Sequence, residues 1–64
     1  MKVKIGKYRL FYNPGNRNNG ILHVRAVVDG MFVCRRWDGV RWRYDVKSQY
    51  YFDINGKYMT WAGR

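Results

Sequence analysis

Three Asp-Gly or Asn-Gly pairs, each lying between β-prone runs, restrict the fold of this 64-residue chain more than any other feature. They are Asp29-Gly30, Asp38-Gly39 and Asn55-Gly56. Such pairs favour two-residue type I′ turns, because both central residues of that turn adopt positive φ. A further stretch, residues 13–20, is rich in Asn and Gly and is expected to be a loop. The chain is therefore expected to fold as short strands joined by tight hairpins.

Strands are expected between these turns, at 2–12, 21–28, 31–37, 40–46, 50–54 and 57–62. Helical periodicity is not evident, and 47–49 is expected to form one short 3₁₀ turn at most. We therefore predict a single all-β domain spanning 1–64, an antiparallel meander of five to six strands. The order of strand, long loop, three-stranded meander, short turn and further strand resembles an SH3-like barrel. Two small packed sheets, an OB-like arrangement and a plain meander are the alternatives.

Two-residue turns would fix the face on which each side chain of 21–46 lies. One face would be apolar and form the core, with Leu22, Val24, Ala26, Val28, Met31, Val33, Trp37, Val40, Trp42, Tyr44 and Val46, and with Arg35 as its one charge. The other face would point outward, in the rows His23–Arg36–Arg41, Arg25–Cys34–Arg43 and Val27–Phe32–Asp45. The prediction is an arginine-rich outer sheet face above an apolar core.

The chain is strongly basic, with 13 Lys and Arg against four acidic residues and a net charge of +9. So much like charge opposes folding unless a partner uses it, and nucleic acid is the commonest partner of that kind. Arginine beside aromatic rings suits contacts to phosphates and stacking on bases. The predicted binding residues are Arg25, Arg36, Arg41, Arg43, His23 and Phe32, extended by Arg17, Tyr51 and Tyr58. A half-exposed strand also alternates apolar and polar residues for structural reasons alone.

Catalytic and metal-binding chemistry is poorly provided for. His23 and Ser48 are the only residues of their types, and Asp29 and Asp38 belong to expected turns. Cys34 is the only cysteine and is expected to be a buried or half-buried structural thiol, so neither a disulfide nor a zinc site is expected. The chain is therefore not expected to be an enzyme or to hold a cofactor.

The expected function is a non-enzymatic nucleic-acid-binding module that is largely tolerant of sequence. The alternative is a small inhibitor or adaptor, of the kind that phages or mobile elements carry, which docks its basic face on an acidic protein surface. No apolar run approaches the length of a membrane span, and no signal peptide is evident, so a cytoplasmic location without membrane contact is expected. DNA against RNA, strandedness and oligomeric state stay open.

Overall fold

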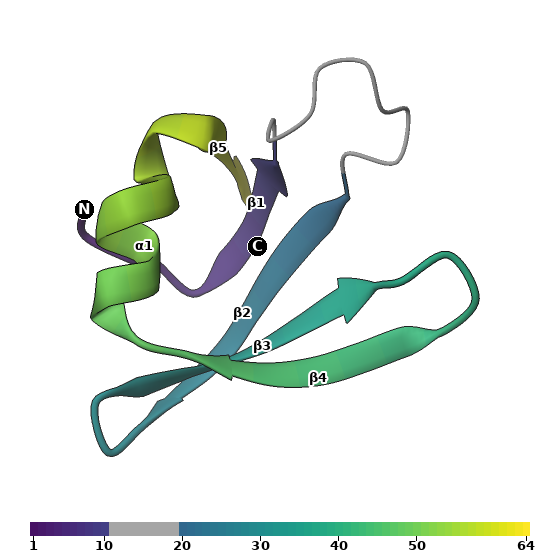
Figure 1. Cartoon of the computed structure of the whole chain (residues 1–64), viewed down its shortest axis with the longest axis horizontal. Coiled ribbons are helices and arrows are strands. Elements are labelled where there is room, and N and C mark those ends of the chain that lie inside the picture. Colours follow the sequence, from purple (N-terminus) through teal and green to yellow (C-terminus); the bar gives the residue numbers. More distant parts are fainter. Residues whose placement is uncertain (11–19) are drawn as a thin grey trace.

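The computed structural model describes residues 1–10 and 20–64. Its elements are β1 (Gly6–Leu10), β2 (Ile21–Val28), β3 (Met31–Trp37), β4 (Trp42–Lys47), α1 (Gln49–Asn55), η1 (Gly56–Tyr58) and β5 (Met59–Gly63). All five strands form one antiparallel sheet in the order β4-β3-β2-β1-β5 (Figure 1). The fold is mostly β, as predicted. The sheet is not closed into a barrel, so the SH3-like barrel is not confirmed, and there is no second packed sheet among the described elements.

The turn between β2 and β3 has the predicted form. Asp29 and Gly30 both adopt positive φ, 52° and 76°, and Val28 pairs with Met31. A two-residue type I′ turn has this geometry. The first hairpin therefore begins in the register that the Asp-Gly pair predicts.

A β-bulge at Arg25 then changes that register. Ala26 pairs with Val33 as predicted, but Val24 pairs with Cys34 and His23 with Arg35. An extra residue in one strand reverses the facing of every side chain beyond it. The predicted rows that joined His23 to Arg36 and Arg25 to Cys34 are therefore wrong.

The turn between β3 and β4 is longer than predicted. One carboxylate oxygen of Asp38 accepts hydrogen bonds from the backbone N–H groups of Val40 and Arg41, both at 2.8 Å. These bonds hold a four-residue turn over 38–41, so Trp37 pairs with Trp42 and not with Val40. Every β4 partner moves by two residues, and an even shift leaves each side chain on its predicted face.

The segment predicted as the strand 50–54 is a helix, so the hairpin predicted around Asn55-Gly56 is wrong. Ser48 has extended backbone angles, and its side chain accepts a hydrogen bond from the N–H of Tyr51, as an N-cap does. At the other end the side-chain amide of Asn55 donates to the carbonyl of Tyr51 at 2.8 Å. α1 is thus capped by its own side chains, and 59–63 continues alone as β5.

The core lies between α1 and one face of the sheet. Phe52 of α1 is completely buried, and its ring meets those of Phe32 at 5.1 Å and Tyr8 at 6.4 Å. The buried set is Tyr8, Leu10, Leu22, Val24, Phe32, Cys34 and Phe52. On β3 these are the residues that were predicted to point outward. The face predicted to be the core carries no described element over it, and we call it the open face.

The backbones of β1 and β5 approach each other closely at Gly6 and Gly63. Gly6 has φ of +142°, and a Cβ placed there would lie 2.7 Å from the carbonyl oxygen of Gly63 and 2.8 Å from Nε1 of Trp61. Only glycine fits this approach without a shift of the backbone. The close contact lets the last strand of the chain pair with the first.

Candidate nucleic-acid interface

The four arginines predicted to form one patch are not all brought together. Arg36 and Arg43 are paired on the helix side of the sheet, whereas His23 pairs with Arg35 on the open face. Arg41 lies in the four-residue turn, and Arg25 forms the bulge. The bulge explains the position of His23, because it turns the β2 residues that precede it to the opposite face of the sheet from the one predicted. Arg17 lies outside the described residues.

The aromatic residues predicted to flank that patch belong to the core or to the helix side. Phe32 is 9% exposed and meets Phe52 edge-on. Tyr51 is half-buried against Phe52, and the ammonium group of Lys47 lies 4.5 Å from its ring centroid. Tyr58 lies in η1, where Lys57 is 5.1 Å from its ring. None of these three rings extends an arginine patch on the sheet.

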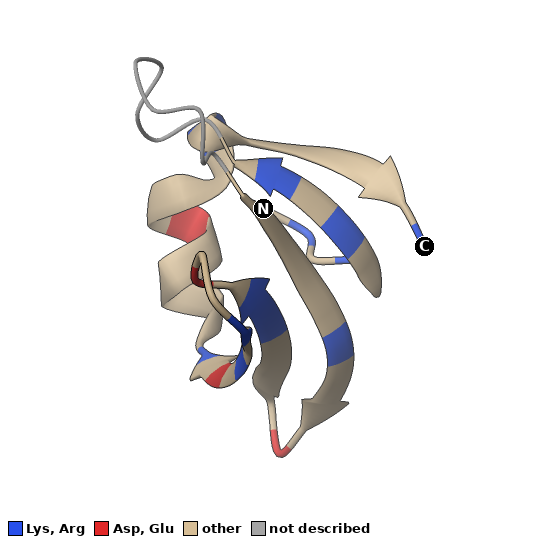
Figure 2. Cartoon of the chain, turned by 90° about the vertical axis from the view of Figure 1, so that its right-hand side faces the viewer, with Lys and Arg blue, Asp and Glu red and all other residues tan. Residues whose placement is uncertain are grey.

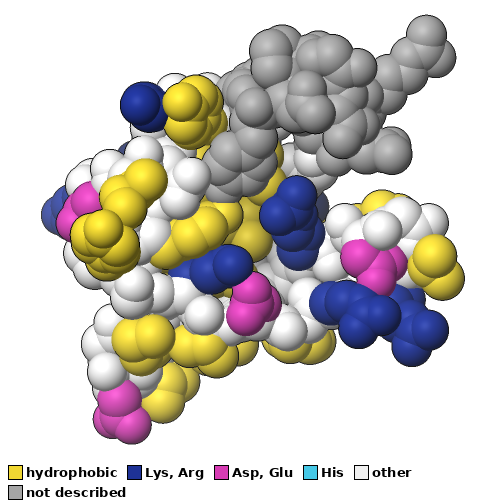
Figure 3. Space-filling model, viewed as in Figure 1, with side chains coloured by type: hydrophobic (Ala, Val, Ile, Leu, Met, Phe, Trp, Pro, Cys, Tyr) yellow, Lys and Arg dark blue, Asp and Glu magenta, His cyan; other side chains and the backbone are white. Residues whose placement is uncertain are grey.

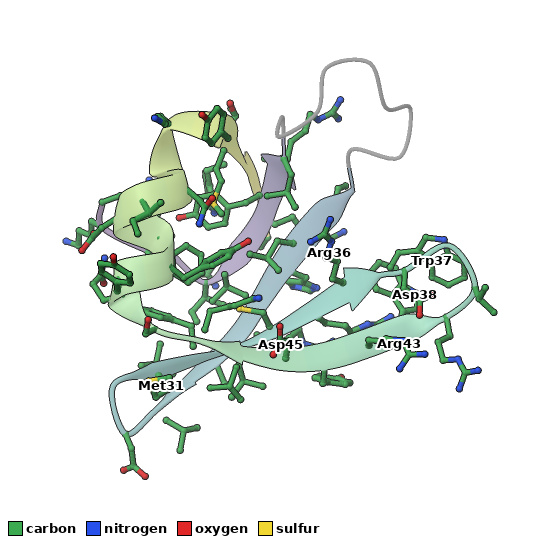
Figure 4. The ribbon with its side chains drawn as sticks, viewed as in Figure 1. Met31, Arg36, Trp37, Asp38, Arg43 and Asp45 are labelled. Atoms are coloured by element: carbon green, nitrogen blue, oxygen red, sulfur yellow. The ribbon has the colours of Figure 1, made fainter. Side chains whose placement is uncertain are left out.

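Acidic side chains on the helix side neutralise basic ones. Asp38 pairs with Arg43, and Asp45 pairs with Lys47 at 2.7 Å (Figures 3 and 4). Hydrogen bonds from the backbone of Arg41, the side chain of Arg43 and the backbone of Val40 lower the pKa of Asp38 to about 2. A third acid, Asp53 on α1, pairs with the amino terminus at 2.8 Å. The amino terminus, Arg43 and Lys47 on this side therefore each have an acidic partner.

The open face carries basic residues in register across three strands. Lys7 on β1 pairs with His23 on β2, His23 pairs with Arg35 on β3, and Arg35 pairs with Tyr44 on β4. We call Lys7, His23 and Arg35 the cationic row. Arg9, two residues from Lys7 on the same strand, lies on the same face. Figure 2 shows basic residues recurring on neighbouring strands and only isolated acidic residues.

The ionisation of His23 reports how positive this face is. Burial lowers its pKa, and the charges of Arg25, Lys7 and Arg35 lower it further. These charges come from β2 itself and from both strands packed against it. The permanent positive charges of the cationic row are those of Lys7 and Arg35. No described acidic residue is among the groups that shift the pKa of His23. Because Arg25 is close enough to His23 to lower its pKa, we group it with Lys7, Arg9 and Arg35 as the open-face cations.

Three exposed aromatic rings lie at one end of the open face. Trp37, Trp42 and Tyr44 are 46%, 44% and 63% exposed. The rings of Trp37 and Trp42 meet edge-on at 5.5 Å, and the guanidinium carbon of Arg35 lies 4.3 Å from the centroid of Trp42. We call these three rings the ring cluster. It adjoins the cationic row directly, because Arg35 and Tyr44 are cross-strand partners.

Arg35 belongs to the cationic row and contacts the ring cluster, and its burial costs folding free energy. Its Nε atom is buried and has no hydrogen-bond partner among the described residues. A buried donor without a partner costs about 1–3 kcal/mol, and more when the group is charged. A native structure that keeps such a group calls for an explanation, and binding is one.

The opposite end of the open face is aliphatic. Val28, Met31 and Val46 are 55%, 37% and 53% exposed, with Val33 and Ala26 half-buried between them. Met31 lies at the far end of β3 from Trp37 (Figure 4). The open face thus has an aliphatic end and an aromatic, cationic end.

Sequence reasoning did not include Lys7, Arg9, Arg35, Trp42 and Tyr44 among the candidate binding residues. The alternation in β3 and β4 did place Arg35, Trp42 and Tyr44 together on one face. The presence of Arg35 on an otherwise apolar face was the signal that this face meets solvent, because an unpaired arginine is rarely buried.

Cys34 is fully buried on the helix side of the sheet, and burial raises the pKa of its thiol to about 11. In the described part of the chain no three His, Cys or Asp side chains come close enough to hold a metal ion. None of the described helices has the length and apolarity to cross a bilayer. Comparisons with protein-family models, with curated proteins and with solved structures found no match.

Proposed function

We propose that this protein is a non-enzymatic nucleic-acid-binding module and that it binds through the aromatic, cationic end of its open face. The observation that supports this is the separation of charge between the two sides of the sheet. On the helix side, aspartates pair with Arg43 and Lys47. On the open face the cationic row runs beside exposed rings, and no acidic residue lies in the rows that these residues form.

This arrangement suits a polyanion that also offers flat apolar surfaces. Arginine and lysine neutralise phosphates and release counterions, which supplies affinity without reading sequence. Exposed tryptophan and tyrosine supply stacking, which every base accepts. The module is therefore expected to tolerate most sequences.

Two double variants that remove equal charge test the proposal. Arg9→Ala/Arg25→Ala removes two open-face cations, and Arg36→Ala/Arg41→Ala removes two of the arginines predicted from sequence alone. Binding of labelled DNA and RNA oligonucleotides is measured by fluorescence anisotropy in about 50 mM salt, with circular dichroism as the fold control. Two lost phosphate contacts weaken binding roughly 50-fold at this salt.

The open-face variant is expected to show that loss, and the other variant a much smaller one. Equal losses would show that the positive surface acts diffusely and would remove the open face from the proposal. Absence of binding by the unmodified protein to any oligonucleotide in low salt would overturn the function itself.

A second candidate function is docking on an acidic protein surface, as an inhibitor or adaptor. The exposed aliphatic end, with Val28, Met31 and Val46, favours it, because apolar patches rimmed by polar residues mark protein contacts. Affinity capture from a nuclease-treated lysate discriminates the two functions. A stoichiometric protein that is retained, and that is lost with Met31→Lys, would favour docking.

A further inference from the structure

We infer that the open face selects single-stranded over duplex nucleic acid, with the phosphate chain along the cationic row and unpaired bases stacked on Tyr44 and Trp42. This inference rests on the proposed function and deepens it. The geometry that carries it is the direct cross-strand adjacency of Arg35 and Tyr44 beside an already stacked Trp42.

The ring cluster is held in place before any ligand arrives. Trp42 has the guanidinium of Arg35 against it at 4.3 Å, and Trp37 meets it edge-on at an interplanar angle of 69°. Neighbours that restrain a ring reduce the entropy lost when a base stacks on it. Trp42 is nonetheless 44% exposed, so part of its surface stays available.

Tyr44 is the most exposed ring of the cluster, at 63%, and no described residue stacks on it. It lies at the end of the row Lys7–His23–Arg35–Tyr44, which crosses four neighbouring strands. Strands lie about 4.8 Å apart, so the row spans about 14 Å. A short stretch of single strand fits across the sheet with its charged chain on the basic residues and its bases at the ring end.

A duplex does not fit the same features. Its base faces are stacked within the helix, and its grooves admit an α-helix or a two-stranded ribbon, not the flat face of a five-stranded sheet. The rings of the open face therefore have access only to unpaired bases.

The experiment compares three probes on the full chain: an oligothymidylate of roughly 12 nucleotides, a duplex of the same length, and inorganic polyphosphate, which has no bases. The variants are Tyr44→Leu, which stays apolar but cannot stack, and Tyr44→Phe, which keeps the ring. Tyr50→Ala, 71% exposed on α1, is the matched control for loss of an exposed tyrosine. Tryptophan fluorescence adds a second readout, because a base stacked on Trp42 quenches it.

Tyr44→Leu is expected to weaken oligothymidylate binding by about 5- to 150-fold, the range found when one stacking ring is lost. Tyr44→Phe keeps the stacking ring and is expected to recover most of that loss. Tyr50→Ala is expected to bind as the unmodified protein does, and polyphosphate binding should not change in any variant. The duplex is expected to bind more weakly than the single strand and to quench tryptophan less.

Equal or tighter duplex binding, or an unchanged affinity in Tyr44→Leu, would overturn the single-strand inference while leaving nucleic-acid binding in place. Loss of polyphosphate binding in Tyr44→Leu would also overturn it, because stacking would then not be the cause. No binding of oligothymidylate or duplex would overturn the proposed function as well, so the two failures are distinguishable.

Discussion

Phe52→Ala is the substitution that most directly tests the packing of α1 on the sheet. Phe52 is completely buried and meets three rings, those of Tyr8, Phe32 and Tyr51. Removing a buried phenylalanine side chain costs about 3–5 kcal/mol, since transfer energy is lost and a cavity is left. A domain of this length has a total stability of about 3–10 kcal/mol. The variant is therefore expected to lose a third or more of its folding free energy.

Urea unfolding followed by circular dichroism measures this loss, with two companions. Phe52→Leu keeps most of the volume and is expected to cost about 1 kcal/mol, so it gives a value even if Phe52→Ala does not fold. Tyr50→Ala, on the exposed side of the same helix, is expected to change stability by about 0.5 kcal/mol or less. Equal effects at positions 50 and 52 would refute the helix-on-sheet packing, because a hairpin would place both on its apolar face.

Four further outcomes are expected. Binding to single strands should fall with salt at a log–log slope of about −3, because four open-face cations neutralise phosphates, and a slope near zero would contradict this. The Cys34 thiol, with its pKa raised to about 11, should resist a thiol reagent at pH 8 until urea unfolds the chain. Because the pKa of Asp38 is lowered, its ionised carboxylate stabilises the fold at pH values above its ordinary pKa of 3.8, and this contribution is lost as the pH falls toward 2. The free energy of unfolding of Asp38→Asn should therefore fall less on acidification than that of the unmodified protein. Gly6→Ala should lower the free energy of unfolding by about 1–3 kcal/mol, measured in urea, because its Cβ meets the backbone of Gly63.

The parts of the fold that sequence predicted are those set by local backbone chemistry. Asp29 and Gly30 adopt the positive φ that their turn requires, and the strands of the meander follow the apolar alternation. The alternation also placed Arg35, Trp42 and Tyr44 on one face. What it could not decide was which face is covered, because both faces of β3 carry large apolar residues.

Long-range packing decided the rest. α1 has seven residues, too few for a periodic apolar stripe, and its N-cap signal is a single serine, Ser48. Its tyrosines and Phe52 favour a strand by intrinsic propensity, and burial of Phe52 against the sheet overrides that preference. The bulge at Arg25 contains no glycine, so the sequence gives no local indication of it. The packing of α1 and the bulge at Arg25 therefore place the candidate binding surface on the other side of the sheet from the one predicted.

The extra residue in β2 makes this protein sensitive to the parity of insertions and deletions. Deleting the residue at position 25 would make the β2–β3 pairing continuous. Leu22 and Val24, which are buried, would then point to the solvent-exposed face of the sheet. The 38–41 turn can gain or lose residues in twos, because each pair returns the chain to the same facing. Length variants of this chain should therefore survive at the β3–β4 hairpin in even steps and fail in β2 at a single step.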